Sequence, residues 1–149
     1  MIFFRPNKKF MSWLKKYTNN RLIVDVGCGE GYFLHLLNKA KMKAIGIDPY
    51  TTLLPDPYRT HPTPTNILPV HAQSSPLVTM RENSLIIIAR PCHSNFCYET
   101  ILAKHPSSEV LYIGKKENIE LDLGELPYTT VFESAGDEKE VVLSIQGKI

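Results

Sequence analysis

The chain has 149 residues, of which 43% are hydrophobic and 21% are charged, and its formal net charge at pH 7 is +2. This composition is that of an ordinary globular protein, and the length predicts a single domain over residues 1–149. No apolar stretch is as long as a membrane span, the first residues lack the features of a signal peptide, and three cysteines do not make a disulfide framework, so we expect a cytoplasmic protein.

The N-terminal region, residues 1–21, carries six basic residues and no acidic one. Apolar residues recur there at helical spacing, which predicts a helix over 8–18 with its lysines in solvent. Nucleic acid is an alternative partner for this basic arm, but it is not favoured because no motif of interleaved aromatic and basic residues accompanies the charge. The residues expected on the buried face are Phe10, Trp13, Leu14 and Tyr17.

A glycine-rich turn follows the first predicted strand. The apolar run over 22–26 predicts that strand, and apolar residues at helical spacing predict a helix over 31–40. Three glycines between them let the backbone approach a nucleotide-like ligand, because glycine has no Cβ. Their spacing, G-x-G-x-G, differs from the G-x-G-x-x-G fingerprint of dinucleotide-binding proteins. Asp25, just ahead of the turn, would repel a diphosphate and suits a ligand that carries an ammonium group.

The rest of the chain predicts an α/β fold. A strand over 43–48 ends in Asp48, where nucleotide-binding folds place a carboxylate for ribose hydroxyls. The run over 84–89 has the continuous apolar character of a strand covered on both faces. Five prolines over 55–69 exclude a regular helix there. The other predicted elements are strands over 66–71 and 109–113, a helical turn over 76–81, a helix over 94–104, a weak helical signal over 114–127, and an antiparallel hairpin with strands over 129–133 and 140–145.

The pattern D-x-G-C-G-x-G from Asp25 to Gly31, with Asp48 closing the next strand, resembles motif I of the class I S-adenosylmethionine (SAM)-dependent methyltransferases. The resemblance spans nearly the whole chain. It implies a Rossmann-like, doubly wound, mostly parallel sheet closed by a C-terminal antiparallel hairpin, with reduced helices between strands two and three and after strand five. It also implies SAM as the cofactor, with Asp25 toward the methionine ammonium and Asp48 on the ribose hydroxyls. The remaining residues that it implies in cofactor binding are Gly27, Cys28, Gly29 and Gly31 beside the methionyl and ribose groups, and Pro49 and Tyr50 over the adenine.

After the third strand the family often carries an acid followed by alanine, and the acid meets the adenine amino group. Here the positions read His71, Ala72 and Gln73, so the carboxylate is absent. Three readings stay open: His71 or Gln73 replaces the acid as acceptor, the contact is lost, or His71 merely ends a strand.

The acceptor site of this family lies beyond strand four, where the chain reads Arg90, Pro91, Cys92, His93, Ser94, Asn95 and Phe96. Only Pro91 matches the Asp/Asn-Pro-Pro-aromatic motif of enzymes that methylate amino groups of DNA, so base methylation by that arrangement is not expected. His93 is the candidate base, since its pKa lies near working pH, and a helix-capping role is the alternative. Pro91 and Cys92 are assigned to the acceptor side and Arg90 to the cofactor side. A metal site is not predicted, because Cys92, His93 and Cys97 lack a fourth ligand nearby.

The sequence therefore predicts a SAM-dependent methyltransferase with an unidentified acceptor. A non-catalytic SAM-binding domain that serves as a partner subunit is the alternative, motivated by the missing acid and the short crossovers. Reduced helices would leave part of a sheet face bare, which predicts a homodimer or a partner protein. A nicotinamide-dependent oxidoreductase is disfavoured by the glycine spacing and by Asp25.

Overall fold

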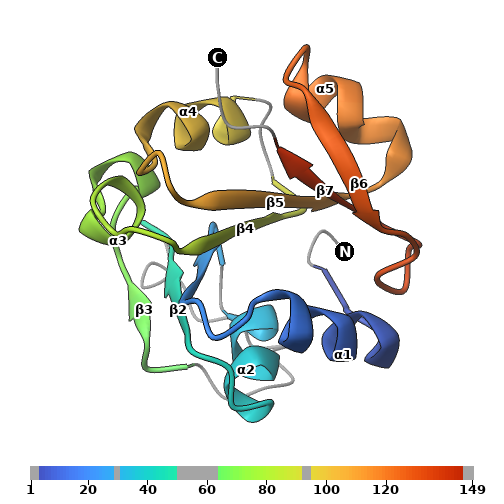
Figure 1. The fold of residues 1–149 in the computed structure, drawn as a ribbon, viewed down its shortest axis with the longest axis horizontal. Coiled ribbons are helices and arrows are strands. Elements are labelled where there is room, and N and C mark those ends of the chain that lie inside the picture. Colours follow the sequence, from blue (N-terminus) through green and yellow to red (C-terminus); the bar gives the residue numbers. More distant parts are fainter. Residues whose placement is uncertain (1–3, 29–30, 50–63, 92–94, 146–149) are drawn as a thin grey trace.

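In the computed structural model of this chain, the described residues are 4–28, 31–49, 64–91 and 95–145. They contain one seven-stranded sheet with the order β3-β2-β1-β4-β5-β7-β6 (Figure 1). The first five strands along the chain run parallel to one another, and β7 is antiparallel to both β5 and β6. The strands are β1 (Ile23–Val26), β2 (Ala44–Ile47), β3 (Ile67–Leu68), β4 (Leu85–Ala89), β5 (Glu109–Gly114), β6 (Tyr128–Phe132) and β7 (Val141–Ile145). The predicted mostly parallel sheet closed by an antiparallel hairpin is thus confirmed.

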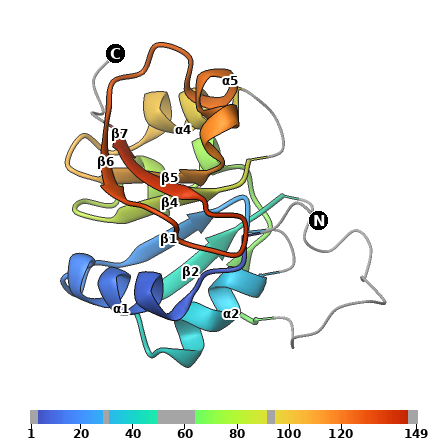
Figure 2. The same ribbon diagram turned by 90° about the vertical axis from the view of Figure 1, so that its right-hand side faces the viewer.

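Helices cover both faces of the sheet, as a doubly wound fold requires (Figures 1 and 2). Two lie on one face, α1 (Lys8–Tyr17) and α2 (Tyr32–Lys39). On the other face lie α3 (Pro76–Thr79), α4 (Phe96–Ala103) and α5 (Ile119–Leu123). Two short 3-10 helices, η1 (Ala72–Ser74) and η2 (Lys116–Asn118), complete the described elements.

Strand β4 divides its side chains between two hydrophobic clusters. Leu85 and Ile87 pack on the side of α1 and α2, whereas Ile86 and Ile88 pack on the side of α3 and α4. All four side chains are fully buried. Successive residues of a strand point to opposite faces, so a strand between two helical layers needs apolar residues at every position. This explains the uninterrupted apolar run that the sequence shows.

The predicted N-terminal helix is confirmed, with Phe10 and Leu14 fully buried. The side chain of Asn7 caps it by accepting a hydrogen bond from the Phe10 amide at 2.9 Å. The amide of Asn7 donates to the carbonyl of Ala135 at 2.8 Å, so the β6–β7 turn anchors the start of the helix. The side chains of Lys8, Lys9, Lys15 and Lys16 are exposed, as expected of a solvated face; a nucleic-acid partner stays an untested prediction.

The third strand is shorter than the sequence suggests. It covers two residues instead of the predicted 66–71, and the chain enters η1 at Ala72. After β5 the chain forms only η2 and the five-residue α5, which confirms the reduced helix expected there. The predicted proline loop falls mostly within residues 50–63, outside the described ranges.

The predicted homodimer or partner protein stays a prediction. Light scattering, which measures the molar mass in solution, would test it. In the described ranges no helix has both the length and the apolar character needed to cross a membrane.

Candidate functional site

The glycine turn lies at the carboxyl end of the parallel strands, where open α/β sheets bind ligands. Strands β1 and β2 pair so that Asp25 lies opposite Gly46. The amide of Gly27 donates to the carbonyl of Ile47 at 2.7 Å, which ties the turn to the end of β2. Gly27 has a φ of +74° and Gly31 a φ of +88°, values that side-chain-bearing residues rarely adopt. The turn therefore needs glycine at both positions; Gly29 lies outside the described residues.

Asp25 is the most unusual residue of the site. Its side chain is only 2% exposed, and its Oδ2 atom has no hydrogen-bond partner among the described residues. Burial raises its pKa from the ordinary value of 3.8 to about 7, and the negative charge of Asp48 adds to the effect. A buried carboxylate with an unused oxygen is costly unless a cation or donor arrives to pair with it. The ammonium group of SAM fits that requirement.

This pKa shift predicts how stability depends on pH. Because the folded-state pKa of Asp25 lies above its ordinary value, the folded protein holds the proton more tightly than the unfolded chain. The carboxylate should therefore destabilise the fold increasingly as pH rises from about 4 to about 7. Urea unfolding of wild type and Asp25→Asn across this range should show the variant gaining stability relative to wild type as pH rises. A difference that does not change with pH would contradict the raised pKa.

Cys28 has a structural role in the turn. Burial raises the pKa of its thiol, and the neighbouring carboxylates Asp25 and Asp48 add to this, so the reactive thiolate is disfavoured. A Cβ placed on Gly46 would lie 2.7 Å from the Cys28 sulfur and 2.8 Å from Cδ2 of Leu34. The glycine in β2 thus makes the room that lets the turn pack against the strand.

We predict that Gly46→Ala destabilises the protein by about 1–3 kcal/mol, because the added methyl group overpacks a filled site. Urea denaturation measures the change. Adding Cys28→Ala to that variant should restore part of the loss, since it removes the sulfur that meets the new methyl group. Cys28→Ala alone is the control. An unchanged midpoint in Gly46→Ala would contradict the packing that the distances describe.

The structure brings Asp48 to the same edge as Asp25. Asp48 directly follows β2, its amide donates to the carbonyl of Leu68 at 3.0 Å, and its charge acts on Asp25. Pro49 comes next and is half-buried, whereas Tyr50 lies outside the described residues. The two acids expected from the sequence therefore lie near the carboxyl ends of neighbouring strands, Asp25 within β1 and Asp48 just after β2. Their contacts with a cofactor stay predictions.

The positions after β3 form the start of η1. His71 precedes this helix and is exposed, Ala72 is buried, and Gln73 is exposed. Ala72 belongs to the core on the α3 and α4 side. An adenine contact by His71 or Gln73 stays a prediction.

On the acceptor side, Arg90 has partners that the sequence did not suggest. Its guanidinium pairs with Glu138 and, at 3.1 Å, with Glu140, which is 1% exposed. Its φ of +52° turns the chain at the end of β4. A cofactor contact by Arg90 stays a prediction. Pro91 is half-buried, and Cys92 and His93 lie outside the described residues.

Phe96, the first residue of α4, ends the acceptor segment expected from the sequence, but no individual role was predicted for it. A Cβ placed on Gly27 would lie 3.1 Å from Cζ of the Phe96 ring. The helix that follows the acceptor segment thus reaches the glycine turn. The only signal available in the sequence was an aromatic residue near the predicted start of that helix.

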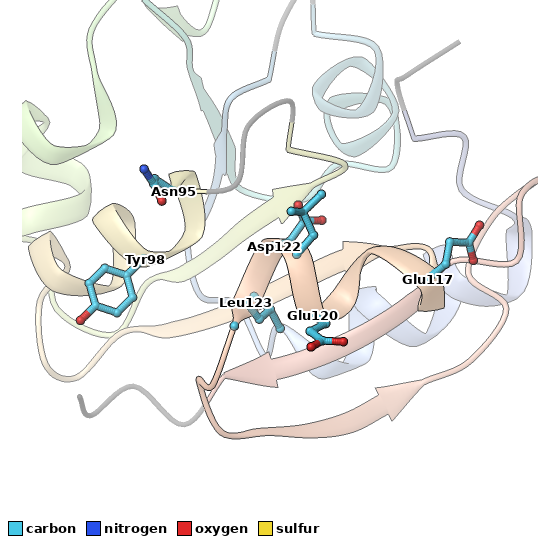
Figure 3. A pocket seen from close by; sticks show the side chains of 8 residues that line it. Asn95, Tyr98, Glu117, Glu120, Asp122 and Leu123 are labelled. Atoms are coloured by element: carbon cyan, nitrogen blue, oxygen red, sulfur yellow. The ribbon is translucent and has the colours of Figure 1, made fainter.

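A groove of about 610 Å³ lies away from this site. It runs between α4 and α5, and neither Asp25 nor the glycine turn lines it (Figure 3). We place the candidate site at the turn, because the unpartnered carboxylate lies there. The groove is lined by Asn95, Tyr98, Glu117, Glu120, Leu121, Asp122, Leu123 and Gly124.

Solved structures share this fold. The magnesium protoporphyrin IX methyltransferase of Synechocystis with bound SAM matches 92% of this chain and 76% of its own, with a TM-score of 0.53 and 15% identity. The 23S rRNA methyltransferase ErmE matches 96% and 68%, with a TM-score of 0.55 and 13% identity. A mutant of MtNAS in complex with SAM matches 92% and 61%, with a TM-score of 0.57 and 10% identity.

The chain has the Rossmann-like fold of class I SAM-dependent methyltransferases. Identities this low show the fold and leave the activity of this chain to be argued from its own residues. No protein-family model matches the sequence. No curated protein matches it either.

Proposed function

We propose that the protein is a SAM-dependent methyltransferase. The observation that carries the proposal is the buried carboxylate of Asp25, whose Oδ2 lacks a partner among the described residues beside the glycine turn. The fold, shared with methyltransferases solved with bound SAM, supports it. So does Asp48, which ends the neighbouring strand.

When bound, SAM supplies a methyl group on a positively charged sulfur, which a nucleophile can attack. The task of the chain is to hold the cofactor and the acceptor in line and to keep water out. Asp25 would pair with the ammonium group, and Asp48 would accept hydrogen bonds from the ribose hydroxyls. The backbone from Gly27 to Gly31 would lie beside the methionyl and ribose groups, because it offers no Cβ at its glycines.

Calorimetric titration with SAM and with its product, S-adenosylhomocysteine, tests this proposal. We expect saturable binding of both and no binding of NAD, because Asp25 repels a diphosphate. Transfer of a labelled methyl group should then be measured against pools of small molecules, protein and RNA. The absence of SAM and S-adenosylhomocysteine binding, or tight binding of NAD, would contradict the proposal.

For the acceptor side, we propose His93 as the base and Pro91 with Cys92 as its neighbours, from their position after β4. Once an acceptor is known, His93→Ala should lower kcat by about a hundredfold and leave the Kd for SAM unchanged. His105→Ala is a matched control, since the Nδ1 of His105 lies 2.8 Å from the hydroxyl of Ser107 in the loop after α4. A loss confined to SAM binding would contradict the role of base.

A further inference from the structure

The ring of Phe96 lies against the glycine turn at Gly27. The Cζ, Cε1 and Cε2 atoms of its ring lie 3.1, 3.3 and 4.0 Å from the place where a Cβ on Gly27 would be. A side chain at position 27 would crowd the ring and would also have to adopt a φ of +74°. Asp25 lies two residues before this contact, so an acid and an aromatic ring flank the start of the turn.

The position of Phe96 is fixed by its helix. Cys97 and Ile101 are buried in the core, and the hydroxyl of Thr100 donates to the carbonyl of Phe96 at 2.9 Å. Phe96 itself packs against the same core and is half-buried, so part of its surface stays accessible. Its neighbours Asn95 and Tyr98 face the groove instead. Phe96 is thus the residue that this helix directs at the turn.

An aromatic face attracts a cation that cannot form hydrogen bonds, and the sulfonium of SAM is such a cation. We propose that Phe96 contacts this sulfonium through its ring and makes the site favour SAM over S-adenosylhomocysteine. The inference rests on the proposed function. When an electron pair of the acceptor forms a bond to the methyl carbon, the carbon–sulfur bond breaks, and the sulfur keeps the electron pair of the broken bond and becomes a neutral thioether. The attraction to the ring then disappears, which favours release of the product.

The affinities of Phe96 variants for the two compounds test the proposal, because they differ in the charge on sulfur. Phe96→Leu should weaken SAM binding by about three- to tenfold and change S-adenosylhomocysteine binding by less than about twofold. Phe96→Tyr keeps the ring and should keep the wild-type ratio of the two affinities. Tyr98→Leu, which removes an exposed ring on the same helix, is the matched control and should change neither affinity.

If Phe96 has a purely structural role, Phe96→Leu should weaken the binding of SAM and of S-adenosylhomocysteine equally. That result would overturn the proposal. Tighter binding of SAM to Phe96→Leu would also overturn it, because the ring would then obstruct the site. If wild type binds neither compound, the proposed function fails and this inference fails with it. If wild type binds both and the ratio is unchanged in Phe96→Leu, only this inference fails.

Discussion

Replacing Asp25 with asparagine should lower the affinity for SAM by about a hundredfold, which corresponds to about 2.7 kcal/mol. The carboxylate is buried, and its Oδ2 atom is unpaired among the described residues, so an incoming ammonium would stabilise the ionised form of Asp25 in a medium of low dielectric. Asparagine has nearly the same shape but carries no charge. Calorimetric titration of wild type and variant with SAM measures the change.

The same variant separates a binding role from a structural one. A buried carboxylate with one oxygen unpaired among the described residues destabilises the fold at neutral pH, so Asp25→Asn should unfold at the same or a higher urea concentration than wild type. Asp137→Asn, in the exposed β6–β7 turn, is the control and should alter neither property. Loss of SAM binding together with loss of stability would indicate that Asp25 supports the fold instead of the ligand.

Replacing Arg90 with methionine should destabilise the protein by about 3 kcal/mol. Arg90 joins the end of β4 to the hairpin through Glu140, which is 1% exposed and would be left as a buried charge without its cation. Removing one partner of a buried pair costs more than removing both, because the remaining charge stays desolvated. Urea denaturation at neutral pH measures the loss.

Two further variants check this explanation. Glu138→Gln removes the partner of Arg90 that is 44% exposed at its side chain, and it should destabilise the protein much less than Arg90→Met, because solvent screens an exposed charge. Adding Glu140→Gln to Arg90→Met should recover part of the stability, because it removes the stranded charge. If Arg90→Met lowers the free energy of unfolding no more than Glu138→Gln does, the buried pair of Arg90 and Glu140 contributes little to stability. The proposed link between β4 and the hairpin would then be wrong.

Local patterns were sufficient to predict most of the secondary structure. The burial of Phe10 and Leu14 follows from helical spacing, and the position of β4 follows from its apolar run. The strand, turn and helix around Gly27 and Gly31 follow from their glycines, because few other residues adopt the required backbone. In each case the signal lies within a few residues of the element that it predicts.

Contacts between distant segments could not be predicted in this way. The hairpin strands were expected, but no local pattern indicates that β7 lies between β5 and β6. Arg90 and Glu140 are fifty residues apart, and neither shows in the sequence that it is buried with the other. The approach of Phe96 to Gly27 likewise depends on how α4 packs on the sheet.

In the candidate site too, local patterns predicted some residues, whereas others depend on contacts between distant segments. Asp25 and Asp48 were predicted because each follows an apolar run that fixes its place at a strand end. The role of Gly46 was not predicted, because its need for space comes from Cys28 in another element. The sequence can therefore predict residues whose place is set by the end of a strand. Residues whose place is set by packing between elements can be identified only from the structure.

A crystal structure with S-adenosylhomocysteine bound tests the central claim most directly. We expect the amino group of the ligand to bind the Asp25 carboxylate, either by a direct hydrogen bond or through one water molecule. The ribose hydroxyls should meet Asp48, with the glycine turn along the sulfur. A ligand bound elsewhere, or one whose amino group has no contact with Asp25, would contradict it.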